Sequence, residues 1–448
     1  MSNRDRERSR GVIALVAVLC TLLAAGDAGA QSFDFCGCEG STNGLGSFSS
    51  SDPSTWPPGS TLVNNFYASC EDAIRIPLQP DGDGVLVFDS ITVGLDARGC
   101  NLSMSFINNK ANTPVTLLVK HDVTIQSGGR INVSGFPGGD GSAGAAGTPG
   151  GGGPGGFAGG DGAYQIVNLT ADGGTGIGPG GGAGGIASTH IPPIGGALLS
   201  VPELRPLVGG SGGGGGLSLA ASSTCSAGGG GGGGGALLIA ANGTIDIQTN
   251  GIVWADGGVG GTRGNNTCSS PGSGGSGGAI RLAARTIQGG GQVLARGGNY
   301  GCCGEFGGVG GSAGRIRLEA ITNTFSASGT DPIAVRAPAP GPLTNPVTPT
   351  VRITKIDGNA TPAQPIGYLN QIDMLVNAPG AIQIDLATAD VPAGTDVEVT
   401  VKPKVGGAAT SQRVTLASCT AGACAAASSF DLVAGAYIVE ARATFQTP

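Results

Sequence analysis

The sequence predicts an all-β fold, in which a β-solenoid with glycine-rich excursions precedes a β-sandwich domain. Short segments that alternate apolar and polar residues recur through residues 81–336, and this alternation marks half-buried strands. Glycine saturates residues 135–314, whereas residues 31–134 and 345–448 have an ordinary composition. Residues 350–448 hold five further alternating segments, separated by turn-forming residues. These three observations define the predicted architecture.

The solenoid is predicted from an internal repeat. Each copy has an alternating strand, a short break and a second strand that ends in a small residue and glycines; the copies begin at Leu117, Leu237, Ile280 and, in shortened form, Ile316. One such unit cannot bury its apolar face alone, so stacked copies are expected. The glycine-rich inserts leave each copy at a similar place, so we expect them on one side of the stack.

One glycine-rich stretch has a strict period. Between Gly135 and Gly162, ten glycines fall at every third position. Three interpretations stay open: packed extended polyglycine helices, a flexible loop, or a collagen-like triple helix. The stretch holds only three prolines, which is few for collagen. Cysteines within the later inserts favour an ordered structure over a flexible loop.

The C-terminal region is predicted to be a separate domain. Residues 337–349 are rich in proline and should form a stiff, extended linker. Residues 350–448 have the strand spacing of an immunoglobulin-like β-sandwich. The alternating segments begin at Thr350, Ala381, Thr395, Gln412 and Ala436.

The first residues have the layout of a cleavable signal peptide, residues 1–30. A basic start is followed by an apolar run from Gly11 to Ala25 and by Ala28-Gly29-Ala30 before Gln31. The run is shorter than the ~20 residues that span a bilayer. We therefore expect a secreted or cell-surface protein with no transmembrane segment, whose mature chain starts with a cysteine-containing segment, residues 31–80.

The cysteine count suits an exported protein. Eleven cysteines less Cys20 of the signal peptide leave ten, an even number that favours disulfides. Cys419 and Cys424 should pair across a tight turn. The connectivity of the others stays open: Cys36, Cys38, Cys70, Cys100, Cys225, Cys268, Cys302 and Cys303. No metal site is predicted, because Cys36-Gly37-Cys38 is the one tight pair and structural zinc commonly uses two.

Composition excludes nucleic acid as a partner. Removing the signal peptide leaves 23 − 4 = 19 basic and 30 − 3 = 27 acidic residues, a net charge of −8. The chain has five lysines and no basic stripe to neutralise phosphates. Matches to G-x-G-x-x-G arise from polyglycine and lie outside any βαβ unit, so no nucleotide or other cofactor is predicted.

No catalytic residues are predicted. The chain has two histidines, His121 and His190, and no G-x-S-x-G nucleophile elbow accompanies them. The segment Asp81-Gly82-Asp83-Gly84 starts like a calcium-binding loop but departs from that motif at Val85. Acidic residues that a solenoid enzyme needs in a cluster are scattered singly, at Asp122, Asp246, Asp256 and Glu319. Arginines recur in register at 281, 285, 315 and 317, where they predict either a solvated face or a ladder that meets acidic glycans.

The repeats and the C-terminal region resemble bacterial exported glycine-rich proteins that join a β-solenoid to an immunoglobulin-like β-sandwich. The matching segments are NTPVTLLVKHDVTI from Asn112, GGSGGAIRLAA from Gly274 and GGSAGRIRLEA from Gly310. The resemblance covers most of residues 84–448 and contains no catalytic motif. It therefore implies architecture and location, but no ligand.

Together these features predict a secreted or cell-surface structural or adhesive protein without catalytic activity. The alternatives are a carbohydrate-binding surface protein and, third, a glycan-active solenoid enzyme. Surface glycans, matrix and self-association are the expected partners.

Overall fold

The computed structural model describes residues 34–41, 44–65, 70–79, 82–96, 98–142, 144–164, 170–219, 225–264, 268–302, 307–344, 349–363, 367–404, 406, 408–417, 419–420 and 422–444. The predicted signal peptide and Gln31 lie outside these residues. All elements below belong to one compact unit, Phe35–Pro448. The described residues contain strands and two short 3₁₀ turns, η1 (Pro53–Thr55) and η2 (Ala327–Gly329), but no α-helix.

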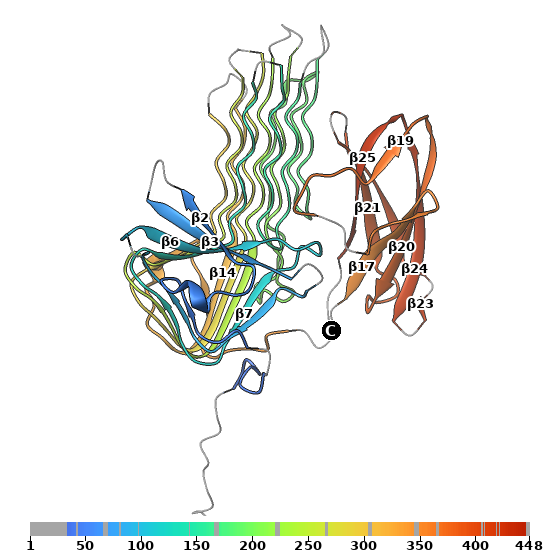
Figure 1. The fold of residues 1–448 in the computed structure, drawn as a ribbon. Helices are drawn as coiled ribbons and strands as arrows, with labels where there is room; N and C mark the ends of the chain where they lie inside the picture. Colours follow the sequence, from blue (N-terminus) through green and yellow to red (C-terminus); the bar gives the residue numbers. More distant parts are fainter. Residues whose placement is uncertain are drawn as a thin grey trace, which may run out of the picture. The chain divides into compact units, whose positions relative to one another are not determined.

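Sheet 1 has nine strands, all paired in parallel (Figure 1). Its main path is β1 (Phe48–Ser49), β5 (Ile91–Val93), β8 (Val123–Ile125), β10 (Ala236–Ile247), β12 (Ala279–Gln288), β14 (Arg315–Asn323) and β16 (Val335–Ala337). Two further strands extend from this path: β7 (Val115–Val119) pairs with β10, and β4 (Val85–Phe88) pairs with β7.

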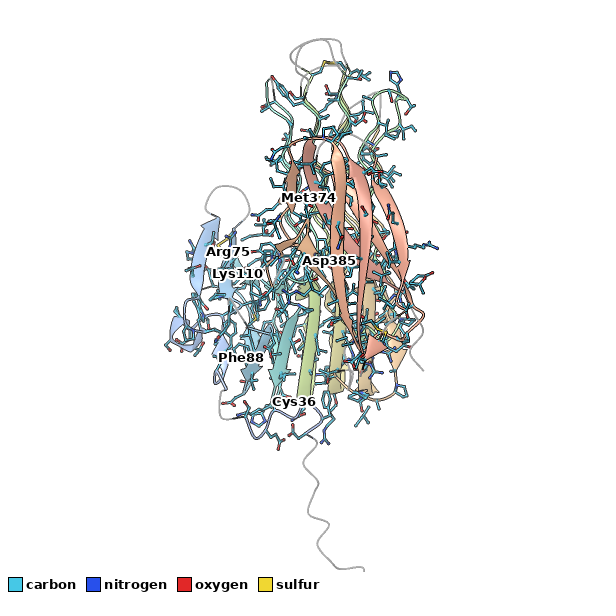
Figure 2. All side chains as sticks on the ribbon, turned by 90° about the vertical axis from the view of Figure 1, so that its right-hand side faces the viewer. Cys36, Arg75, Phe88, Lys110, Met374 and Asp385 are labelled. Atoms are coloured by element: carbon cyan, nitrogen blue, oxygen red, sulfur yellow. A yellow bond between two sulfur atoms is a disulfide. The ribbon has the colours of Figure 1, made fainter. Side chains whose placement is uncertain are left out.

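Sheet 2 has seven strands, and all of its pairs are parallel except β2 with β3. Its order is β15 (Thr330–Asp331), β13 (Gln292–Leu294), β11 (Ile252–Trp254), β9 (Gly129–Asn132), β6 (Asn101–Ile107), β3 (Glu71–Pro77) and β2 (Thr61–Asn65). Sheets 1 and 2 enclose one hydrophobic core, to which both contribute alternate Ile, Leu and Val side chains. Within it the rings of Phe48 and Phe88 lie 6.0 Å apart, with Phe88 labelled in Figure 2.

The prediction of a β-solenoid is wrong: the sheets are mixed and form no closed coil in the described residues. Each repeat gives a long strand to sheet 1 and a short strand to sheet 2, then leaves both sheets through a glycine-rich segment. Residues 255–264, for example, follow β11 and carry no strand. The antiparallel β2 and two separate antiparallel sheets also lie outside any coil. Alternation located the strands correctly but contained no information on how the chain returns between them.

The glycine-rich segments run side by side as a hydrogen-bonded layer (Figure 1). Successive N–H groups of residues 229–235 donate to three different neighbouring segments in rotation. The first neighbour supplies the carbonyls of Gly139, Phe136 and Val133, which accept from Gly229, Gly232 and Gly235. The second supplies those of Gly160 and Phe157, which accept from Gly230 and Gly233. The third supplies those of Ser273 and Ser276, which accept from Gly231 and Gly234. A period of three in donors and acceptors is that of an extended helix with three residues per turn.

The number of neighbours explains where glycine is required. A Cβ on Gly229, Gly230 or Gly231 would lie 1.9–2.0 Å from a carbonyl oxygen of a different neighbour, because this segment is enclosed on all sides. Residues 228–235 are accordingly all glycine and all buried. The peripheral segment 135–141 has neighbours on fewer sides, so it carries side chains between its glycines.

Two antiparallel sheets form the C-terminal region. Sheet 3 contains β17 (Thr350–Ile356), β18 (Asn359–Ala360), β20 (Gly380–Ala389), β23 (Cys419–Thr420) and β24 (Ala423–Leu432); sheet 4 contains β19 (Met374–Val376), β21 (Asp396–Pro403), β22 (Thr410–Thr415) and β25 (Gly435–Ala443). They share a second hydrophobic core. The five alternating segments are strands, but β24 was missed, because its ACAAASSFDL sequence shows little apolar alternation.

Candidate functional site

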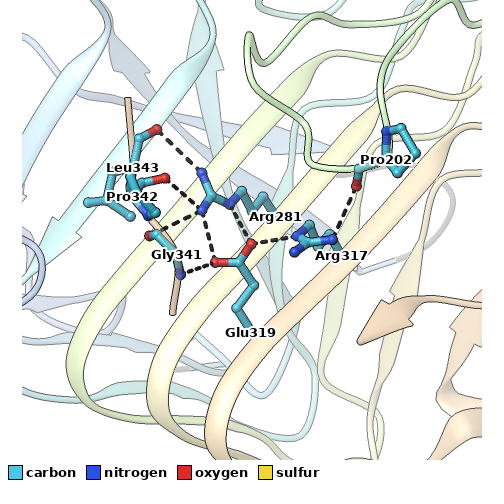
Figure 3. Close-up of polar contacts among 7 residues, drawn as sticks. All are labelled: Pro202, Arg281, Arg317, Glu319, Gly341, Pro342 and Leu343. Atoms are coloured by element: carbon cyan, nitrogen blue, oxygen red, sulfur yellow. Dashed lines mark hydrogen bonds and ion pairs between the residues drawn. The ribbon is translucent and has the colours of Figure 1, made fainter. Parts of the chain in front are cut away.

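Three of the charged residues singled out in the sequence meet in one buried cluster (Figure 3). Parallel pairing places Arg281 of β12 beside Arg317 of β14, and Glu319 lies two residues further along β14. Arg281 makes a two-point ion pair with Glu319, with Nη2–Oε2 at 2.8 Å and Nε–Oε1 at 3.1 Å. Arg317 Nε donates to the same carboxylate. The side chains of Arg281 and Glu319 are 1% and 2% exposed.

The same cluster fastens the proline-rich linker to sheet 1. Arg281 donates to the carbonyls of Gly341, Pro342 and Leu343 at 3.3, 2.9 and 3.3 Å, and the Gly341 N–H donates to Glu319 Oε2 at 2.8 Å. Burial opposes ionisation of Glu319, but the hydrogen bonds from Arg281, Arg317 and the Gly341 N–H outweigh it and lower the pKa of the carboxyl. The cluster therefore holds the linker against sheet 1, and we call it the Arg281–Glu319 lock.

The four arginines do not form one exposed ladder. Besides Arg281, Arg315 Nη1 donates to the carbonyl of Ser200 at 3.0 Å, and Arg317 Nη1 donates to that of Pro202 at 3.4 Å. Three of the four arginines thus hold other segments of the chain against sheet 1, while Arg285 is exposed.

The scattered acids act as separate hydrogen-bond acceptors. Asp122 Oδ1 accepts from the Thr244 N–H at 2.6 Å, and Asp256 Oδ1 accepts from the Arg296 N–H at 2.7 Å. Asp140, in a Gly-Gly-Asp-Gly stretch, accepts from the Thr262 N–H in the same way at 2.7 Å. Each carboxylate satisfies a backbone donor of the next repeat. Both His121 and His190 are exposed, and Asp246 accepts a side-chain hydrogen bond from Gln248.

The cysteines that the structure describes form disulfides. The bonds join Cys36–Cys38, Cys70–Cys100, Cys225–Cys268 and Cys419–Cys424. The last is the pairing that the sequence predicts, across β23 and β24. Cys302 is also disulfide-bonded, while Cys303 lies outside the described residues. Asp34, Cys36 and Cys38 bring their possible metal-ligand atoms within 4.8 Å of one another, and the two sulfurs of this group are bonded to each other.

A cluster that sequence reasoning missed lies on the outer face of sheet 2, the face turned away from the core. Arg130 of β9 pairs in register with Ser103 of β6, and Trp254 of β11 pairs with Asn132. The guanidinium carbon of Arg130 lies 5.0 Å from the indole ring centroid, and Arg130 forms an ion pair with Glu71 of β3. The intervening Ile131 and Val253 point into the core.

This cluster contains polar atoms without partners. Arg130 Nε, Trp254 Nε1 and Ser103 Oγ are shielded and make no hydrogen bond with the described protein atoms. Leaving a buried polar group unpaired costs ~1–3 kcal/mol, and such groups are rare in folded proteins. In the sequence, these residues are isolated polar or aromatic side chains on strand positions that face away from the core. They form a cluster only because parallel pairing places their strands side by side.

A groove lies where sheet 4 approaches the glycine-rich layer. Its volume is about 1320 Å³, and residues of β21, β25 and the segment around Gly178 line it. Lys402 Nζ lies 2.7 Å from Glu440 Oε2 and donates to the Gly176 carbonyl at 3.2 Å, while the Gly178 N–H donates to Glu440 Oε1 at 2.9 Å. These contacts hold sheet 4 to the layer.

One carboxyl in the groove, that of Asp373, has a shifted pKa. Loss of hydration raises the pKa of Asp373; the hydrogen bond from the Val439 N–H opposes this shift, and the negative charge of Glu440 adds to it.

No family model, curated protein or solved structure matches this chain. In the part of the chain that the structure describes, no helix is long and apolar enough to span a membrane.

Proposed function

We propose that this chain is an exported structural or adhesive protein, secreted or held at the cell surface, that presents binding surfaces and does not catalyse a reaction. The observation that carries the proposal is the glycine-rich layer. Its interior is backbone packed on backbone through hydrogen bonds, so it is a continuous solid body built around almost no side chains. Its outer positions display side chains on a fixed framework.

Several of those displayed side chains are large and apolar. Phe136, Val259 and Tyr300 are 53%, 46% and 50% exposed. They lie on adjacent segments, because the Gly138 N–H donates to the Val259 carbonyl at 2.9 Å and the Gly260 N–H to the Asn299 carbonyl at 2.8 Å. Apolar groups held on a rigid framework lose little conformational entropy on binding, which favours adhesion.

The experiment measures adsorption of the chain from Gln31 to hydrophobic and polysaccharide-coated sensor surfaces, with sedimentation to detect self-association. We expect Phe136→Ser, Val259→Ser and Tyr300→Ser combined to reduce adsorption severalfold. Leu375→Ser is the matched control, because Leu375 is 63% exposed but belongs to sheet 4. Absence of adsorption by the unaltered protein, or equal loss in the control, would contradict the proposal.

The proposed export of the protein is supported by the residues at the start of the sequence. Ala28 and Ala30 occupy the small-residue positions of a cleavage site, so the exported form should begin at Gln31. N-terminal sequencing of exported protein tests this. A chain that begins before Gly26 or after Phe33 would show that cleavage does not occur as proposed.

A carbohydrate-binding function is the second candidate. The unpaired polar atoms on the outer face of sheet 2 favour it, because sugars supply hydroxyl groups that both donate and accept hydrogen bonds.

A further inference from the structure

The outer face of sheet 2 presents two parallel rows of side chains that run across its strands. One row contains Arg75, Ser105, Asn132, Trp254, Leu294 and Asp331, and the next contains Ala73, Ser103, Arg130, Ile252 and Gln292. Neighbouring strands lie ~4.8 Å apart, so each row repeats at that distance. An extended linear polysaccharide laid across the strands repeats its sugar rings at a similar distance. The rows therefore match a linear glycan in spacing.

The unpaired atoms define what a ligand must supply. Trp254 Nε1 and Arg130 Nε are donors only, and Ser103 Oγ both donates and accepts. No described protein atom accepts from either nitrogen. A ligand that brings oxygen acceptors to this place would satisfy all three groups at once.

The charges on this face are of both signs, because exposed Arg75 and Asp331 lie at opposite ends of the row that contains Trp254. This balance favours a neutral ligand. Glu71 is ion-paired with Arg130, yet its side chain is still 41% exposed. Its carboxylate repels an acidic sugar but accepts a hydrogen bond from a hydroxyl. The chain from Gln31 also carries 19 basic and 27 acidic residues, a net charge of −8, which further disfavours a polyanion.

We infer that the outer face of sheet 2, centred on Arg130 and Trp254, binds a neutral, hydroxyl-rich linear polysaccharide. Arg130 turns away from the indole as the chain enters, so that a sugar ring stacks on Trp254 while Arg130 Nε, Trp254 Nε1 and Ser103 Oγ meet its hydroxyls. The inference deepens the second candidate function, carbohydrate binding, and rests on it, since it names the ligand.

The test uses tryptophan fluorescence and calorimetry with cellohexaose and mannohexaose as neutral probes and polygalacturonate as the acidic one. Trp56→Phe leaves Trp254 as the sole tryptophan, because the chain contains two. We expect a saturable fluorescence change with a neutral hexasaccharide. Binding of neither hexasaccharide would overturn the inference, as would tighter binding of polygalacturonate.

Substitutions separate binding from folding. Trp254→Ala and Arg130→Gln should weaken hexasaccharide binding by about tenfold or more. Ser103→Ala is the sharper variant, because it removes an unpaired hydroxyl: thermal stability should stay the same or rise, while affinity falls severalfold. Arg413→Gln, at a side chain that is 72% exposed on sheet 4, is the control and should leave affinity unchanged. Unchanged affinity in Ser103→Ala and Arg130→Gln would exclude this site.

The adhesion assay distinguishes the two proposals. If Trp254→Ala loses hexasaccharide binding but still adsorbs through Phe136, Val259 and Tyr300, both proposals stand. If the unaltered protein adsorbs but binds no hexasaccharide, the inference alone fails. If it binds hexasaccharide through Trp254 but adsorbs to neither kind of sensor surface, the adhesive function fails and the glycan site stands.

Discussion

Arg281 and Glu319 form an ion pair at 2.8 Å between neighbouring strands of sheet 1, and both side chains are almost fully buried. The pair is stable in that environment because Glu319 also receives hydrogen bonds from Arg317 and the Gly341 N–H, and because Arg281 also donates to linker carbonyls. The ion pair thus joins two strands and the linker at one place.

Removing one partner should be more harmful than removing both. Arg281→Met leaves the Glu319 carboxylate buried with fewer donors, and breaking such a pair costs ~3–5 kcal/mol. The double substitution Arg281→Met with Glu319→Leu should unfold at a higher urea concentration than Arg281→Met alone. A double variant that is as unstable as the sum of the two single variants would contradict this, because it would show no coupling between the residues.

Acid should weaken the lock. The folded-state pKa of Glu319 lies below its ordinary value of 4.5, because the hydrogen bonds to the carboxylate outweigh burial. The stabilisation is therefore fully present above pH 4.5 and is lost as the pH falls through the folded-state pKa. We expect the melting temperature of the unaltered protein to fall more between pH 6 and pH 3 than that of Glu319→Gln. Equal falls would refute the assignment.

Much of the fold was visible in the sequence because strands leave a local signal. The repeats at Leu237, Ile280 and Ile316 are successive strands of sheet 1, and their register pairs Leu237 with Ile280 and Ile280 with Ile316. The closed solenoid was wrong because closure depends on the path of residues without alternation. A glycine-rich segment has the same local composition whether it returns to the stack or packs in a separate layer.

The candidate sites were harder to predict, because they depend on long-range pairing. Arg281 and Glu319 are 38 residues apart, and no local pattern indicates that they pair in the core. Arg130 and Trp254 are more than a hundred residues apart and meet only because β9 and β11 are neighbours in sheet 2. Cys419 and Cys424 were predictable, because their contact is local.

The glycine-rich layer should tolerate substitution only at its edge. A Cβ on Gly231 would lie 2.0 Å from the carbonyl oxygen of Gly258, whereas a Cβ on Gly307 meets no atom within 4 Å. Gly231→Ala should destabilise by ~3 kcal/mol or more, because backbone must shift to admit the methyl group. Gly307→Ala is the matched control and should change stability by less than ~0.5 kcal/mol. Chemical unfolding of both variants measures the difference.

The disulfides should differ in their contribution to stability. Cys225–Cys268 closes a separation of 43 residues and Cys419–Cys424 one of 5 residues. On the chain-entropy estimate, the longer loop contributes ~4 kcal/mol and the shorter ~2 kcal/mol. Replacing both cysteines of each pair by serine should therefore lower the melting temperature more for the 225–268 pair. Peptide mapping without reductant checks the pairings first, and free thiols at both Cys419 and Cys424 would end the claim for that bond.

We predict that the protein will not turn over polysaccharides. Three of the residues that the sequence nominated have structural contacts: Asp122 accepts a backbone N–H of the next repeat, Arg281 holds the linker, and Arg317 contacts Glu319 and Pro202. The test is to incubate the chain with neutral and acidic polysaccharides, with and without calcium, and to measure new reducing ends and unsaturated products.

If the protein does turn over a polysaccharide, we expect the active site to be the groove beside sheet 4. Asp373 has a raised pKa and feels the charge of Glu440, an arrangement that acid–base catalysis also uses. However, Glu440 is paired with Lys402 and the Gly178 N–H, and Asp373 accepts from the Val439 N–H. We therefore expect product no higher than with heat-inactivated protein. Product formation that Asp373→Asn or Glu440→Gln abolishes, with folding intact, would show that the groove is an active site and that the protein is an enzyme.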